Sequence, residues 1–214
     1  MYSNLASLNA AILAEMGRTG DTVLTARLPD LVKMGERRIY NGDESIGTAP
    51  LRCREMETRG TLTFTDGVSA TPAAFLEAKR LTWETDRPSK LKYTVPDEFY
   101  TSIYRTPPNT LAFPLIFTIE GTVIDIAPKA SGTATLSYYA RPSDLSVTDT
   151  NSVLTTHGHI YFLSTLIDAY AYVRNALKRD ETVSRYAGAL AGVNNAAVRA
   201  RYAGTHLAPR IPGA

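Results

Sequence analysis

The spacing of apolar residues changes twice along this chain, from a helical repeat to an alternation and back again. Residues 5–16 and 31–39 repeat apolar side chains every three or four positions, as one face of an α-helix requires. Residues 61–140 instead hold short runs of alternating apolar and polar residues, the pattern of half-buried strands. Helical spacing returns after residue 158. The pattern predicts a β-structure placed between two helical ends.

The N-terminal part predicts two helices. Asn4 is suited to cap the first helix, which should end at Gly17. The second is expected to begin near Pro29, because proline suits a first helical turn and Asp30 would then lie beside the positive end of the helix dipole. It should end near Asn41. Its inner stripe is expected to comprise Leu31, Val32, Gly35 and Ile39.

The central part predicts about six short strands and one short helix. The clearest hairpin lies in FTIEGTVIDIAP (117–128), with a turn at Glu120–Gly121 and Pro128 ending the return strand. PDEFYTSIY (96–104) is expected to form the short helix. The remaining strands are expected at 61–65, 80–84, 90–94 and 133–140. Connections between near neighbours imply an antiparallel sandwich or a curled sheet.

Two long helices are expected after the strands, at 159–178 and 181–203, with KRDE as the turn between them. The first is apolar on more than one side and should be buried between other helices. The second is rich in small residues. An interior glycine costs a helix about 1 kcal/mol relative to alanine, so Gly188 and Gly192 are predicted to let another backbone approach closely.

The expected fold class is therefore α+β, a helical bundle from both chain ends with an inserted antiparallel β-domain and an extended C-terminal tail. The expected boundaries are 1–50 for the first helices, 51–145 for the β-domain, 146–203 for the last helices and 204–214 for the tail. Pro209 and Pro212 keep the tail from continuing as a helix.

Composition and the N-terminal sequence bear on the cellular compartment in which the chain is expected. The single cysteine, Cys53, cannot form an internal disulfide, and the N-terminus lacks the basic region of a signal peptide. No apolar run outside the helices is long enough to span a bilayer. We therefore expect a soluble cytoplasmic chain without a membrane partner. Residues 169–214 carry seven basic and two acidic residues. Such a basic end suits an acidic partner or nucleic acid, although a solvated helix face fits as well.

His157 and His159 raise the question of a metal site. On a helix the two side chains would point about 200° apart, and Gly158 favours a loop-to-helix junction there. No further histidine or cysteine stands near them in the sequence, so we expect a structural pair and no metal. Cys53 likewise has no adjacent base and is expected to be inert. No nucleophile elbow or phosphate-binding loop appears, and neither an enzyme nor a cofactor is predicted.

The order of several segments resembles the adaptor proteins (head completion or head-to-tail connector proteins) of tailed bacteriophages, which include the upper tail-tube ring proteins of short-tailed phages. Two positions depart from the family pattern, Thr71 where leucine is common and Gly35 where alanine is common. The matching segments are LPDLVKMGERRIY (28–40), EMETRGTLTF (55–64), TPAAFLEAKRLTW (71–83), SKLKYTVPDEFY (89–100), FTIEGTVIDIAP (117–128) and TLSYYARPSDLSVTDTNSVL (135–154).

The resemblance implies a structural virion protein made in the host bacterial cytoplasm, with no catalytic residue. It implies a ring of about twelve copies that joins the portal protein to further tail proteins on the nozzle or tail-tube side. Double-stranded DNA would pass through the ring without specific binding. The C-terminal tail would dock on the portal through an extended anchor segment. The anchor residues would be Leu207, Pro209, Arg210, Ile211 and Pro212.

Two other functions remain open at this point. Five tyrosines near the end of the strands could form a carbohydrate- or nucleic-acid-binding platform on the β-domain. They are Tyr138, Tyr139, Tyr161, Tyr170 and Tyr172. A metal-dependent hydrolase using His157 and His159 is the third possibility, and metal analysis would separate it from the others.

Overall fold

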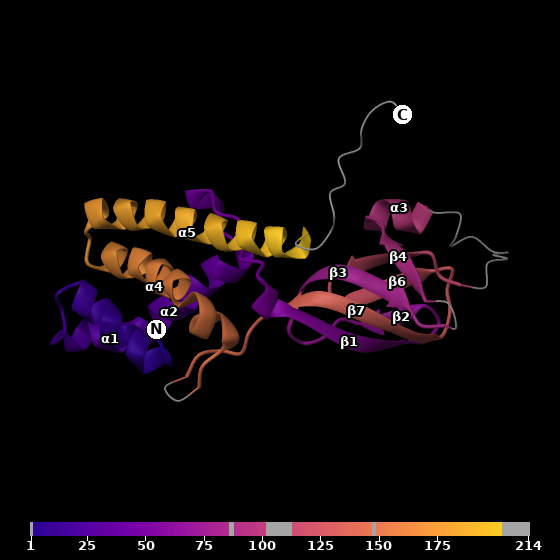
Figure 1. The fold of residues 1–214 in the computed structure, drawn as a ribbon, viewed down its shortest axis with the longest axis horizontal. Coiled ribbons are helices and arrows are strands. Elements are labelled where there is room, and N and C mark those ends of the chain that lie inside the picture. The colour runs from indigo at the N-terminus through magenta and orange to yellow at the C-terminus, as the bar shows by residue number, and fades with distance from the viewer. Residues whose placement is uncertain (1, 86–87, 102–112, 147–148, 203–214) are drawn as a thin grey trace, which may run out of the picture. The chain divides into compact units, whose positions relative to one another are not determined.

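The computed structural model describes residues 2–85, 88–101, 113–146 and 149–202 (Figure 1). The chain divides into two compact units, one of Met1–Glu55 with Pro142–Ala214 and one of Met56–Arg141. The first is built of helices and the second of strands, so the predicted mixed α+β class is confirmed. No helix among the described residues is long and apolar enough to cross a membrane.

The helical unit contains α1 (Leu5–Glu15), α2 (Thr22–Asn41), α4 (Ser152–Tyr172) and α5 (Ala176–Tyr202), with the short 3-10 helix η1 (Glu44–Ile46). A second 3-10 helix, η2 (Arg54–Met56), crosses into the other unit. Helix α4 packs against α1, α2 and α5 (Figure 1). It is buried on nearly all sides, as its all-round apolar sequence predicts.

The predicted start of α2 at Pro29 is wrong, because the helix begins at Thr22 and Pro29 lies inside it. Asp21 caps the true start, where its carboxylate accepts a hydrogen bond of 2.9 Å from the N–H of Leu24. Proline removes the donor for the carbonyl four residues earlier. That residue, Thr25, is exposed, as is Pro29, so water can satisfy the carbonyl.

Gly35 lies where α2 crosses α4. A Cβ built on it would lie 3.2 Å from Thr165 Oγ1 and 3.3 Å from Ser164 Oγ. The Ser164 hydroxyl donates a hydrogen bond of 3.0 Å to the Gly35 carbonyl. The absent side chain therefore lets the two helices approach closely enough for a side chain to bond to the facing backbone.

The turn between α4 and α5 lies at Val173–Asn175, and the prediction that KRDE forms it is wrong. Arg174 adopts a φ of 59°, and Asn175 accepts a hydrogen bond of 3.2 Å from the N–H of Lys178. Lys178 and Glu181 then pair at 2.9 Å within the first turns of α5. Three of the four residues, Lys178, Arg179 and Glu181, have good helix propensity, and the segment extends the helix instead of ending it.

The strand unit is one sheet of seven strands in the order β1-β7-β3-β4-β5-β6-β2. The sheet curls until its edges β1 and β2 meet at the bridge between Thr65 and Val68. Its bounds are β1 (Glu57–Phe64), β2 (Val68–Ala70), β3 (Phe75–Trp83), β4 (Ser89–Tyr93), β5 (Ile116–Glu120), β6 (Val123–Ala127) and β7 (Gly132–Ala140). The inner face buries a core that includes Phe64, Leu81, Trp83, Ile124 and Leu136.

The expectation of a purely antiparallel sheet is wrong at one pair, since β4 and β5 run parallel. Parallel neighbours need a long connection, and here it includes α3 (Pro96–Thr101). The predicted helix at 96–104 is confirmed over its described part. The expected hairpin joins β5 to β6, with the turn one residue later than predicted, at Gly121–Thr122. Strand β2, only three residues long, was not foreseen.

Candidate functional site

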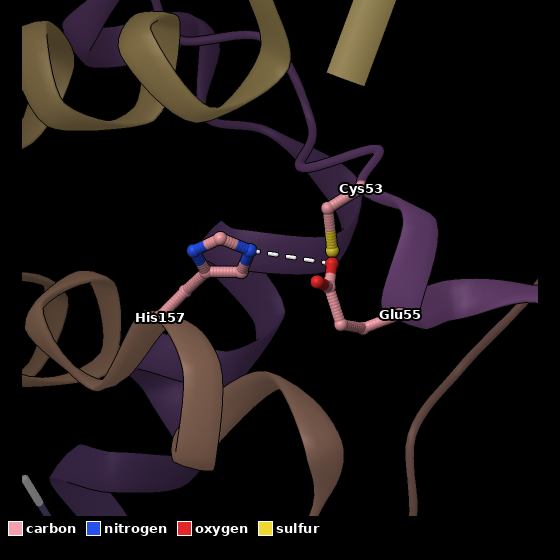
Figure 2. A group of neighbouring side chains, drawn as sticks. All are labelled: Cys53, Glu55 and His157. Atoms are coloured by element: carbon pink, nitrogen blue, oxygen red, sulfur yellow. Dashed lines mark hydrogen bonds and ion pairs between the residues drawn. The ribbon is translucent and has the colours of Figure 1, made fainter. Parts of the chain in front are cut away.

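Three side chains of the helical unit that can act as metal ligands or acid–base groups converge at one point. Cys53 is 1% exposed and stands just before η2, Glu55 lies in η2, and His157 comes from α4. One ligand atom from each lies within 4.8 Å of the other two. Figure 2 shows the imidazole of His157 directed at the Glu55 carboxylate, with the Cys53 sulfur beside it. The Nε2–Oε2 distance is 3.2 Å.

The segment carrying Cys53 and Glu55 is fixed by its backbone. The Arg52 N–H donates to the Asn194 side chain at 2.9 Å, and Asn194 donates in turn to the Pro50 carbonyl at 3.1 Å. The Ser152 hydroxyl donates to the Glu55 carbonyl at 3.3 Å. Helices α4 and α5 therefore both hold this segment in place.

His157 occupies a break in α4. Its backbone has a φ of −123° and a ψ of 37°, outside the helical range, although the helix continues on both sides. Next to it, Gly158 lies under the ring of Tyr2, and a Cβ there would lie 2.7 Å from Tyr2 Cδ2. The predicted loop-to-helix junction at this point is therefore a kink inside a helix. The kink sets the direction of the His157 side chain.

Hydrogen bonds keep Glu55 ionised. Burial alone would raise the pKa of its carboxyl, but bonds from its own backbone N–H, the Cys53 thiol and His157 outweigh burial and lower it. The thiol thus donates to the carboxylate. The imidazole shares that carboxylate, so the arrangement differs from a cysteine–histidine nucleophile pair, in which the thiol bonds to the base.

His159 stays outside this group, with its ring centroid 6.2 Å from that of His157. Burial first, and then the neighbouring His157, lower the pKa of His159. The expectation that Cys53 has no histidine at hand is wrong, because His157 reaches it across 104 residues of sequence. Local spacing carries no signal for such a distant partner.

A second polar group joins α2 to α4. Arg38 forms a two-point contact with Asp168, at 2.8 and 2.9 Å, and also bonds to Asp43 at 3.0 Å. Its side chain is only 10% exposed. This geometry makes Arg38 a buried link in the helical unit.

The strand unit contains a groove where β3 and β4 separate. The two strands pair only from Leu81 to Trp83, whereas β3 continues along β7 back to Phe75. The opening has a volume of about 790 Å³. Phe117 and Ile119 lie at its base, and Lys90 and Lys92 are among its lining residues. The two lysines are exposed and form no ion pair with any described residue.

The predicted site residues fall in two groups. Gly188 and Gly192 are exposed on α5, and a Cβ built at either would meet nothing within 4 Å in the described part of the chain. Among the described residues of the helical unit, therefore, nothing packs closely against these glycines. The anchor residues Leu207, Pro209, Arg210, Ile211 and Pro212 lie outside the described residues.

The comparison with protein families identifies the family of the chain. No curated protein matches the chain. The family described as "SU10 adaptor protein" matches residues 3–210 and so includes both units. The match extends over nearly the entire sequence and agrees with the resemblance to phage adaptors found in the segment order. The chain therefore belongs to the SU10 adaptor protein family, a family of bacteriophage adaptor proteins.

Proposed function

We propose that this protein is a structural component of the virion that forms a ring of about twelve copies between the portal and the tail, around the path of the DNA. The observation that carries the proposal is the family match over residues 3–210. Further tail proteins would bind on the distal side, and the DNA would pass without specific contacts. The family is structural rather than enzymatic.

The outer face of α5 supports the ring. In a closed ring of identical subunits, one face of each copy meets a different face of its neighbour. The exposed residues Ser184, Gly188, Ala191, Gly192 and Asn195 are small and recur at helical spacing. The space beside the two glycines is open among the described residues. The predicted close packing at Gly188 and Gly192 would therefore be made by a neighbouring subunit.

The C-terminal residues supply the proposed portal contact. Leu207 and Ile211 would fill apolar pockets of the portal, and Arg210 would meet a carboxylate. Deletion of residues 205–214 should leave the thermal transition nearly unchanged and abolish binding to the portal of the same virus. A matched control carries Arg199→Ala in the full-length chain, which removes one positive charge outside the tail. Portal assembly by the truncated chain at normal affinity would refute the tail contact.

The groove between β3 and β4 favours a second candidate, a carbohydrate- or nucleic-acid-binding module. Lys90 and Lys92 would meet phosphates or acidic sugars, and exposed Tyr93 beside them could stack on a base or sugar ring. Titration with DNA oligonucleotides at physiological salt separates the candidates. Micromolar binding that Lys90→Glu with Lys92→Glu removes would favour the module. Weak binding that these substitutions leave unchanged would favour the ring.

A further inference from the structure

We propose that Cys53, Glu55 and His157 form a binding site for a divalent transition-metal ion of the zinc type. All three residues belong to the helical unit. The proposal is independent of the ring proposed above, because it concerns how one chain is held together. The expectation of no metal rested on the opposed directions of the two histidines and on the lack of a third and a fourth ligand nearby in the sequence. The structure brings two ligands, Cys53 and Glu55, to His157 alone.

The spacing of the donor atoms fits a tetrahedral site. Zinc binds imidazole nitrogen and carboxylate oxygen at about 2.0–2.1 Å, which places the two donors about 3.3 Å apart at a tetrahedral angle. His157 Nε2 and Glu55 Oε2 are 3.2 Å apart. The Cys53 sulfur lies within 4.8 Å of both donors. A zinc–sulfur bond of about 2.3 Å in a tetrahedral site would require the distance from the sulfur to each of the other donors to be about 3.6 Å.

The donor set also suits such an ion in chemical type and charge. Thiolate and imidazole are ligands that zinc prefers over magnesium or calcium. Loss of the Cys53 proton leaves two anionic ligands and one neutral ligand, so the bound divalent ion is electrically balanced. Balance matters here, because Cys53 is almost fully buried and an uncompensated charge would be costly.

The surroundings leave room for a fourth ligand. A hollow of about 210 Å³ adjoins the three side chains and is lined on the α5 side by Val193, Ala196 and Ala197. None of these side chains can coordinate a metal, so water would take the fourth position. Such an ion would join the segment ahead of η2 to α4. The fixed backbone at residues 50–55 and the kink at His157 already hold the donors near their final places.

The competing explanation is a hydrogen-bonded trio that needs no ion, with the thiol protonated and donating to Glu55. The two explanations differ in the state of the sulfur, because metal binding requires the thiolate and releases a proton. Cobalt(II) reports that state directly, since its bond to a thiolate absorbs in the near ultraviolet and tetrahedral cobalt absorbs in the visible.

The test uses the full-length, untagged, reduced chain after removal of metals with a chelator, titrated with Co²⁺ and then with Zn²⁺. We expect one Co²⁺ per chain, the thiolate absorption band, its loss when Zn²⁺ displaces Co²⁺, and a higher melting temperature with Zn²⁺. Cys53→Ser and His157→Asn should each abolish the band. His159→Asn is the matched control, because that side chain lies outside the group, and should retain it.

Circular dichroism of each variant separates loss of the site from loss of the fold, and the unmodified chain alone can decide the matter. If the folded, unmodified chain gives no thiolate band at saturating Co²⁺, the three residues are only a hydrogen-bonded trio. Because Cys53 is the single cysteine, a band that persists in His157→Asn would show that Cys53 binds the metal without His157 and would overturn the assignment of the three ligands.

Discussion

At the scale of single residues, the two polar groups of the helical unit are contacts between positions far apart in sequence. Arg38 meets Asp168, and Cys53 and Glu55 meet His157. Neither pairing could be predicted from the sequence. The spacing of apolar residues indicates which side of a helix or strand is buried, but it does not indicate which other element packs against that side. The capping role of Asn4 was predictable, because a cap acts on its own helix.

Asp168→Ala should destabilise the chain by about 3 kcal/mol, since it leaves the buried Arg38 guanidinium without its two-point partner. Asp43 still pairs with Arg38 and limits the loss. Chemical denaturation measures the change. Asp180→Ala, which removes an exposed partner of Arg179, should change stability by less than about 0.5 kcal/mol and serves as the control. Equal effects of the two substitutions would show that the Arg38 pair is not buried in solution.

Glu55 should make stability depend on acid. Its pKa in the folded chain lies below the ordinary 4.5, so its contribution is complete above that pH and is lost as the pH falls through the folded value. In the presence of a chelator, lowering the pH from about 6 to 3.5 should reduce the melting temperature of the unmodified chain more than that of Glu55→Gln. Parallel curves for the two proteins would exclude this contribution.

At the scale of elements, the spacing of apolar residues predicted the position of most helices and strands. The ends of helices were predicted wrongly where two local sequence signals competed. At α2 the cap at Asp21 outweighs the first-turn preference of Pro29, because Leu24 and Leu28 gain burial when the helix starts earlier. The parallel pairing of β4 with β5 and the separation of β3 from β4 depend on the whole sheet. No single strand encodes them.

The start of α2 can be tested by two aspartates. Asp21→Ala should cost about 1 kcal/mol, because it removes the cap that accepts from the Leu24 N–H. Asp30→Ala should have little effect, since Asp30 lies in the middle of the helix with an exposed ion pair to Arg27. The opposite ranking in urea denaturation would favour a helix that begins at Pro29.

Gly188→Ala should affect the stability of the isolated chain and the assembly of the ring in opposite directions. The position is exposed and helical with open space for a methyl group, so the single chain should gain about 0.5–1 kcal/mol in stability. If a neighbouring subunit packs there, assembly on the portal should weaken at the same time. Ala26→Ser, a change of similar size at an exposed position of α2, is the control outside this face. Unimpaired assembly of Gly188→Ala would exclude close packing at this glycine.

At the scale of the whole molecule, the change from helical to alternating spacing and back predicted the α+β class, and the order of the quoted segments carried the resemblance to the family. The surfaces that bind other proteins could not be predicted from the spacing of apolar residues. Side chains at such surfaces are similar in polarity to side chains that face only water. The lysines of the groove were therefore recognised only after the fold had placed them on an open surface. Gly188 was singled out by its type and position in a helix, but only the fold showed that the space beside it is open.

The isolated chain should be monomeric in dilute solution and form its ring on the portal. With charged residues at 21% of the chain, no extended apolar run is available to drive assembly unaided. Light scattering should give a mass near 23.3 kDa for the free protein. A stable ring without portal would contradict this.

The division of the chain into an uninterrupted strand unit and a helical unit made from two separated segments has a consequence during synthesis. All strands of the sheet have been synthesised once translation has passed Arg141, whereas α2 lacks α4, and α4 lacks α5, until translation nears the end of α5 at Tyr202. At about 5–20 residues per second, this delay lasts roughly 3–12 s. During that interval the apolar faces of α1 and α2 lack their later partners. We therefore expect a host chaperone to bind this protein mainly while the chain is still attached to the ribosome.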